Sequence, residues 1–238
     1  AVIFGAYTSD RPPGSDWGMM MWRSYAAGLR MSGWTEGAAL SVGQRYTRTK
    51  KSLKEVIDLY SPMDLFEYQD TDALFGELLR DNEVIVYNGH SFYGSLDALS
   101  QKSYYPEETY QILFMNSCWS YEYYTKQVFL KKATEKDPNG WRDVDVINNT
   151  TYAYFPNMYD STSKLMTNLF AGAENLGDDG RGRRYSWQNM IKIMNDEVSG
   201  ICPEDADPQD CRHYQPKSKH EIYGVSGVRD NEFTPTRP

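Results

Sequence analysis

The hydrophobic and polar positions along the chain form two kinds of segment in turn. Short apolar runs, typical of strands buried on both faces, are followed by longer stretches in which apolar residues recur at the spacing of a helix. This alternation is typical of a mostly parallel sheet with helices on its faces. We therefore expect a mixed α/β fold.

The same pattern places the individual elements. It predicts strands over residues 2–7, 40–46, 65–68, 83–87, 110–115 and 144–154. It predicts helices over residues 17–31, 51–60, 71–80, 121–133, 163–176 and 186–198, with Thr71 as the cap of the third. We expect one α/β domain over residues 1–200 and a loop-rich segment, rich in Pro and polar residues, over residues 201–238 that packs on it.

Two strands of the predicted sheet each end in a reactive side chain. Residues 83–87 lead into Asn-Gly-His-Ser, which contains His90, and residues 110–115 lead into Asn-Ser-Cys-Trp, which contains Cys118. The two side chains are 28 positions apart, enough chain for a parallel crossover connection. Because open parallel sheets place their ligands and catalytic groups at the carboxyl edge, we expect His90 and Cys118 to lie within reach of each other.

A cysteine and a histidine in this arrangement indicate nucleophilic catalysis. A thiol attacks a carbonyl when an imidazole accepts its proton, and the imidazole then protonates the leaving amine. Taken singly, a cysteine after an apolar strand is usually a small buried hydrophobic residue, and a lone histidine is usually structural. The placement of both at equivalent strand ends is the observation that favours catalysis.

Residues 84–91 and 112–118 resemble the catalytic blocks of the caspase-like peptidase clan, which includes caspases, metacaspases, legumains, clostripain, gingipains and separase. In that clan one apolar strand ends in His-Gly, and a following apolar strand ends in a small residue and the nucleophilic Cys. The resemblance looks closest to clostripain and the gingipains. It implies a three-layer α/β/α sandwich and a cysteine endopeptidase that needs no cofactor, with Cys118 as nucleophile and His90 as general acid and base.

Ser91 stands where the clan usually has a glycine after the His. The resemblance implies an oxyanion hole formed by the backbone N–H groups of Ser91 and Cys118, a contact that does not depend on the side chain. The serine leaves open a second hypothesis, a weak or inactive caspase-like protein that serves in binding. A third is an α/β serine hydrolase with Ser91 as nucleophile, although residues 89–94 miss the Gly-x-Ser-x-Gly spacing by one position.

The resemblance also implies a deep pocket for one substrate side chain. Several members of the clan line it with a charged residue from the loop after the first strand, where this chain has Asp10; Asp160, after a later strand, is a second candidate. Either carboxylate would favour cleavage after a basic residue, whereas Arg11 would favour an acidic one, and a loop aspartate is often only a local cap. Basic specificity would make the stretch near Arg184 a candidate self-processing site.

Cys202 and Cys211 flank a loop that contains Pro and Asp but few core-forming residues. A disulfide between them would staple this loop and would indicate a secreted or periplasmic protein. The alternative is two unpaired surface thiols. Because residue 1 is not Met and already lies in a strand-like run, we also expect that a leader or pro-segment has been removed.

Composition narrows the classes of partner. The chain has 25 basic and 33 acidic residues and a formal charge of −8, which disfavours nucleic acid and is compatible with a peptide or protein substrate. No apolar run approaches the ~18 residues that span a bilayer. His213 and His220 lie near a cysteine but lack the further ligands of a metal site, so we expect no metal.

Overall fold

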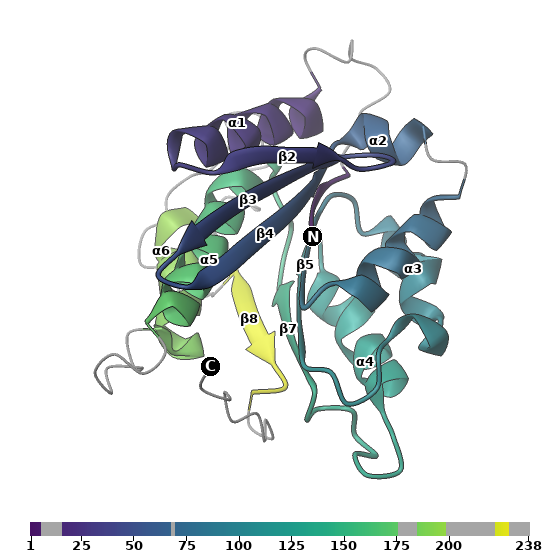
Figure 1. Ribbon diagram of the computed structural model, residues 1–238. Helices are drawn as coiled ribbons and strands as arrows, with labels where there is room; N and C mark the ends of the chain where they lie inside the picture. Colours follow the sequence, from purple (N-terminus) through teal and green to yellow (C-terminus); the bar gives the residue numbers. More distant parts are fainter. Residues whose placement is uncertain (6–15, 68–69, 176–184, 199–221, 229–238) are drawn as a thin grey trace.

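The computed structural model describes residues 1–5, 16–67, 70–175, 185–198 and 222–228 (Figure 1). In this part of the chain it is a mixed α/β structure built on one sheet of eight strands. The order of the strands across the sheet is β2-β3-β4-β1-β5-β6-β7-β8. The strands are β1 Val2–Phe4, β2 Thr35–Ala39, β3 Gln44–Lys50, β4 Leu53–Tyr60, β5 Val84–Asn88, β6 Gln111–Asn116, β7 Val144–Asn149 and β8 Tyr223–Ser226.

The sheet is mostly parallel, as the sequence predicts. The pairs β4–β1, β1–β5, β5–β6 and β6–β7 are parallel. The pairs β2–β3, β3–β4 and β7–β8 are antiparallel. The last pair brings β8, from the expected loop-rich segment, onto the edge of the main sheet.

Helices connect most of the strands. They are α1 Trp17–Met31, α2 Pro62–Glu67, α3 Thr71–Asp81, α4 Ser120–Lys132, α5 Phe155–Glu174 and α6 Trp187–Val198. Three short 3₁₀ segments, η1 Phe92–Gly94, η2 Asp97–Ser100 and η3 Lys102–Tyr104, lie between β5 and β6. None of the helices in the described ranges is long and apolar enough to cross a membrane.

Alternate residues of the central strands face two separate apolar clusters, because successive side chains of a strand point to opposite faces. Val86 and Phe114 belong to a cluster that also contains buried residues of α1, α5 and α6. Ile85 and Leu113 belong to a second cluster, which contains buried residues of α3 and α4. The middle of each of these two strands, β5 and β6, is therefore apolar on both faces, which matches the continuous hydrophobic runs in the sequence.

The helix predicted over residues 51–60 is wrong, because this stretch forms β4. Its apolar residues recur three and four positions apart, which resembles the period of a helix. The structure pairs its acidic residues across the β3–β4 hairpin instead. Arg45 is the register partner of Asp58, and Arg48 is the register partner of Glu55; both pairs form salt bridges. These cross-strand ion pairs favour the strand.

The strand predicted over residues 65–68 is also wrong, because residues up to 67 belong to α2. Ser61 and Asp64 cap this helix reciprocally. The N–H of Asp64 donates to the Ser61 hydroxyl (3.2 Å), and the N–H of Ser61 donates to the Asp64 carboxylate (2.7 Å). Pro62 at the first position supplies a backbone angle that already suits a helix.

Several predicted boundaries need correction. The cap of α3 is Asp70, whose carboxylate accepts a hydrogen bond from the N–H of Ala73 (3.0 Å), and not Thr71. The strand predicted over residues 40–46 is β3, which begins only at Gln44. The strand predicted over residues 144–154 ends at Asn149, because Pro156 lies in the first turn of α5.

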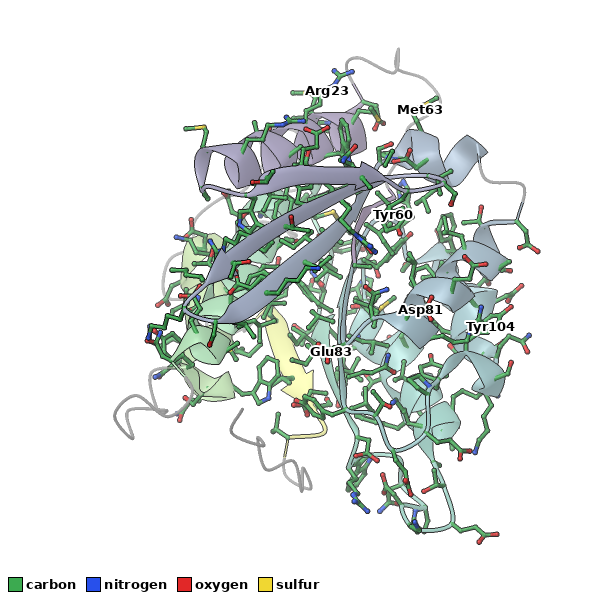
Figure 2. The ribbon with its side chains drawn as sticks, in the orientation of Figure 1. Arg23, Tyr60, Met63, Asp81, Glu83 and Tyr104 are labelled. Atoms are coloured by element: carbon green, nitrogen blue, oxygen red, sulfur yellow. The ribbon has the colours of Figure 1, made fainter. Side chains whose placement is uncertain are left out.

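The connection from β5 to β6 packs closely on α3. Tyr104 lies against Gly76, where an added Cβ would come within 2.6 Å of the Tyr104 ring (Figure 2). The guanidinium of Arg80 lies 5.0 Å from the centre of the same ring. These contacts hold the crossover connection against the sheet between the two strands that carry His90 and Cys118.

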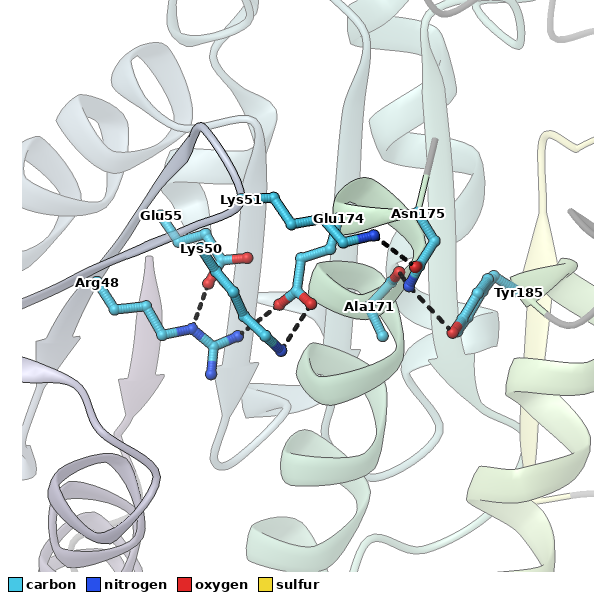
Figure 3. Close-up of polar contacts among 8 residues, drawn as sticks. All are labelled: Arg48, Lys50, Lys51, Glu55, Ala171, Glu174, Asn175 and Tyr185. Atoms are coloured by element: carbon cyan, nitrogen blue, oxygen red, sulfur yellow. Dashed lines mark hydrogen bonds and ion pairs between the residues drawn. The ribbon is translucent and has the colours of Figure 1, made fainter. Parts of the chain in front are cut away.

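The turn end of the β3–β4 hairpin is attached to the end of α5 by charged groups (Figure 3). Arg48 donates to Glu55 and also to Glu174 (3.0 Å), and Lys50 lies 2.7 Å from Glu174. Only 5% of the Glu174 side chain is exposed. The guanidinium of Arg48 also lies over the ring of Trp34, 4.7 Å from its centre. The network fixes the position of α5, whose first residue contacts His90.

Strand β2 is the outer strand at one end of the described sheet. Its pairing with β3 shifts register between Glu36 and Ala39, which marks a bulge. Most of its residues are exposed, and Glu36 forms an exposed salt bridge with Arg30 (3.0 Å).

Candidate active site at the carboxyl edge of the sheet

His90 and Cys118 occupy equivalent positions after two adjacent parallel strands. β5 and β6 pair in parallel, and their register matches Asn88 with Asn116. His90 follows Asn88 by two residues, and Cys118 follows Asn116 by two residues. The two strands that precede these residues are therefore neighbours in the sheet, which is the condition for the two side chains to come together. Both residues therefore leave the sheet at the same edge and the same level.

The backbone of His90 is held on two sides. The N–H of Gly89 donates to the carbonyl of Asn116 (3.2 Å), which extends the strand pairing by one residue. The Tyr87 hydroxyl donates to the carbonyl of His90 (2.9 Å). A Cβ at position 89 would lie 2.6 Å from this hydroxyl, so glycine is the residue that permits the contact.

The imidazole of His90 is exposed and lies between two aromatic rings. Its centre is 6.0 Å from that of Phe92 and 5.2 Å from that of Phe155, and both rings meet it edge to face. Phe155 is the first residue of α5. The ring is thus oriented by apolar contacts from its own loop and from the loop after β7.

Cys118 lies in the turn between β6 and α4 and is partly buried. The N–H of Ala153 points at its sulfur (3.4 Å), and the sulfur lies 3.8 Å from the carbonyl of the same residue. A backbone N–H aimed at sulfur stabilises negative charge that develops there. Within the described residues Cys118 is the one cysteine, and it forms no disulfide.

Residues 153–155 contact both members of the pair. Ala153 contacts the sulfur of Cys118, and Phe155, two residues later, contacts the imidazole of His90. The thiol and the imidazole therefore lie against the same short segment after β7. The aromatic residues of this stretch were candidates for the wall of the cleft from the sequence, but residues up to 154 were expected to form a strand, whereas β7 ends at Asn149.

Ser91 has an ordinary backbone conformation, with φ −80° and ψ −12°. An L-amino acid adopts these angles without strain, so the backbone here does not require a glycine. Its carbonyl accepts hydrogen bonds from the Tyr124 hydroxyl and from the N–H of Gly94 (2.9 Å). Among the described residues, the N–H groups of Ser91 and Cys118 donate to no acceptor, so both are free to bind an anion.

The Ser91 hydroxyl belongs to a residue that is only 8% exposed. A nucleophile elbow needs an exposed serine on a strained turn. The strained residues of this loop are instead Phe92 (φ 46°) and Tyr93 (φ 52°), and a third aromatic residue, Trp119 (φ 53°), directly follows Cys118. Bulky residues rarely adopt this left-handed conformation, and such outliers cluster at functional sites.

A layer of buried amides and hydroxyls lies at the ends of β5 and β6. The Asn116 amide donates to the Asn88 side-chain oxygen (2.9 Å) and to Ser161 (3.1 Å), and Thr162 also donates to Asn88 (2.9 Å). All four residues are fully buried. These asparagines are not among the residues predicted for the site, although a matching Asn stands two residues before both His90 and Cys118 in the sequence.

Asp160 lies on α5 and faces other charged groups. Burial raises the pKa of its carboxyl, the nearby Glu197 raises it further, and Lys164 acts in the opposite direction. The remaining predicted residues, Asp10, Cys202, Cys211 and Arg184, lie outside the described residues, as do His213 and His220. In the described part of the chain, no group of three His, Cys, Asp or Glu side chains could hold a metal ion.

Comparisons with known proteins identify no relative of this chain. The chain matches no family model, no curated protein and no solved structure. The arguments about function therefore rest on the geometry at the carboxyl edge of the sheet.

Proposed function

We propose that this chain is a cysteine endopeptidase of the caspase-like type, with a three-layer α/β/α fold. One observation carries the proposal: His90 and Cys118 each stand two residues beyond a register pair of adjacent parallel strands. The contacts of both side chains with residues 153–155 support it. The two free N–H groups at Ser91 and Cys118 support it as well.

In the proposed mechanism His90 accepts the proton of the Cys118 thiol, and the sulfur forms a bond with the carbonyl carbon of the scissile peptide. The N–H groups of Ser91 and Cys118 bind the oxygen that becomes negative. His90 then gives the proton to the leaving amine as the C–N bond breaks. In the second half of the cycle, His90 activates a water molecule, which hydrolyses the thioester and regenerates the thiol.

The reaction and the side-chain preference are separate parts of this proposal. Cleavage after a basic residue was predicted from Asp10 and Asp160. Residue 10 lies outside the described residues, and Asp160 interacts with Glu197 and Lys164. The peptidase proposal does not depend on either aspartate.

Alkylation by iodoacetamide, followed peptide by peptide in the folded protein, tests the proposal. We expect Cys118 to react faster than glutathione, an unactivated thiol, under the same conditions, and we expect His90→Ala to slow the labelling of Cys118. Cleavage of a casein-type protein substrate should disappear in Cys118→Ala. A Cys118 no more reactive than glutathione, without cleavage, would favour a binding protein. Labelling of Ser91 by a serine reagent would favour the serine hydrolase.

A further inference from the structure

A cavity of about 210 Å³ opens beside the loop that carries His90. It lies on the face of the sheet covered by α3, between the residue after β1 and the η1 and η2 segments. Its wall is mostly apolar and includes Leu65, Phe75, Tyr87, Phe92, Leu96 and Ala98. Two polar residues, Thr71 and Asp72, also line it; both are exposed and so belong to its mouth.

Two residues of the cavity wall, Tyr87 and Phe92, also contact His90. Tyr87 lines the cavity and donates its hydroxyl hydrogen bond to the carbonyl of His90. Phe92 lines the cavity and packs its ring edge to face with the imidazole of His90. Both residues therefore line the cavity and also contact the proposed catalytic base.

Phe92 is placed there at a cost. Its φ of 46° is unfavourable for a large side chain, and half of the residue (51%) is exposed although it is apolar. Tyr93, also left-handed, is 89% exposed. The contact of Phe92 with His90 leaves half of the Phe92 residue exposed, and backbone preference does not explain two left-handed aromatic residues in this loop. A substrate that covers the two exposed rings would account for their position.

We propose that the cavity binds a large apolar side chain, of the phenylalanine or leucine type, next to the scissile bond of the peptide substrate. This inference rests on the proposed peptidase function. A dry cavity of about 150 Å³ holds a benzene molecule, so the volume here accommodates an aromatic ring. The apolar interior, which holds no charged side chain among the described residues, distinguishes this site from a pocket that pairs with a basic side chain deep inside it.

Fluorogenic peptides that differ at a single position on either side of the scissile bond test the inference. At one of these positions we expect Phe or Leu to raise kcat/KM about 10- to 100-fold above Ala, which is the gain from burying such a side chain. Equal rates for Ala, Leu and Phe at every position, or a preference for Lys or Arg alone, would overturn the inference.

Two variants of the wall and one control localise the preference. Phe92→Ala removes a half-exposed side chain from the cavity wall and leaves the buried core intact. Leu96→Glu places a charge in the cavity. Each should lower the ratio of kcat/KM for the Phe peptide to that for the Ala peptide by about tenfold. Leu130→Ala, at an exposed apolar residue of α4 away from the cavity, should leave this ratio unchanged. If Leu96→Glu fails to fold, Phe92→Ala alone decides.

Iodoacetamide is small and can react with Cys118 without occupying the cavity. Its labelling rate therefore distinguishes a failure of the cavity inference from a failure of the peptidase proposal. Fast labelling of Cys118 together with a flat side-chain profile would overturn the cavity inference and leave the peptidase standing. Slow labelling without peptide cleavage would overturn the peptidase proposal and the inference with it.

Discussion

Asn88 and Asn116, the register partners at the ends of β5 and β6, are joined by a hydrogen bond between their side-chain amides (2.9 Å). Both residues are fully buried, two positions before His90 and Cys118 respectively. The bond ties the two strand ends together where both chains leave the sheet. It therefore sets the relative height of the two proposed catalytic residues.

We expect Asn116→Ala to lower the free energy of unfolding by about 1–3 kcal/mol, because the side-chain oxygens of Asn88 and Ser161 each lose the buried hydrogen bond that the Asn116 amide donates to them. Urea unfolding of the single variants Asn116→Ala and Asn88→Ala and of the double variant measures the coupling. Additive effects of the two substitutions would contradict a direct interaction between the amides.

A serine-to-glycine and a serine-to-alanine change at position 91 test whether only the backbone of this residue acts. We expect Ser91→Gly and Ser91→Ala to retain peptide cleavage within a few-fold of the original protein, because the φ of −80° suits all three residues and the N–H is kept. The readout is kcat/KM for one fluorogenic peptide. Loss of all cleavage in Ser91→Ala would point to the hydroxyl as a reacting group.

Because of Lys132, the free energy of unfolding should increase with pH in the alkaline range. Burial lowers the pKa of its ammonium group from 10.5 to about 8, and Asp143 opposes this shift only in part. Between pH 8 and 10.5 the unfolded chain therefore keeps a proton that the folded protein has lost. The free energy of unfolding rises over this range by roughly 1–3 kcal/mol. Urea unfolding at pH 7.5 and 9.5 measures the change.

The matched variant for this test is Lys132→Met. It removes the ammonium hydrogen bonds to the carbonyls of Pro106 (3.1 Å) and Thr109 (2.7 Å), so we expect lower stability at every pH. The informative quantity is the difference between the two pH values, which should shrink in the variant. An equal rise in both proteins would assign the pH dependence to another group.

The carboxylate of Glu174 should contribute more to the free energy of unfolding than an exposed carboxylate does. Glu174→Gln removes the charge that pairs with Arg48 and Lys50, and we expect a loss of about 2–4 kcal/mol in the free energy of unfolding. Arg30→Gln, which breaks the exposed pair with Glu36, should cost under about 1 kcal/mol and is the control. Similar losses in the two variants would contradict the structural role of the buried network.

The pKa of Glu174 predicts how this contribution changes with acidity. Burial alone would raise the pKa, but Lys50 and Arg48 together lower it below its usual value of 4.5. The ion pairs therefore stabilise the folded protein fully above pH 4.5, and this stability is lost as pH falls through the lower folded pKa. The difference in unfolding free energy between the original protein and Glu174→Gln should shrink on acidification.

The strand ends that carry His90 and Cys118 were predictable because continuous apolar runs followed by small polar residues have few other structural explanations. The position of β4 was not predictable in the same way. Its residues Glu55 and Asp58 look like the polar face of a helix until their partners on β3 are known. Those partners lie 7 and 13 residues earlier in the chain, and only the folded hairpin brings them together.

The candidate site, like the fold, could be predicted from the sequence only in part. The two proposed catalytic side chains, His90 and Cys118, can be picked out from local sequence, whereas the contacts that hold them come from a distant segment. Nothing near His90 in the sequence points to Phe155, and nothing near Cys118 points to Ala153. Both contacts depend on β7 lying next to β6 and on α5 beginning directly afterwards.

Strand β2 affects how the molecule behaves at high concentration. An outer strand with free backbone groups can pair with a second molecule and start aggregation. The bulge between Glu36 and Ala39 interrupts the regular spacing of those groups, and Glu36 of the exposed strand carries a charge that pairs with Arg30 of α1. Both features oppose the growth of a continuous intermolecular sheet from this edge.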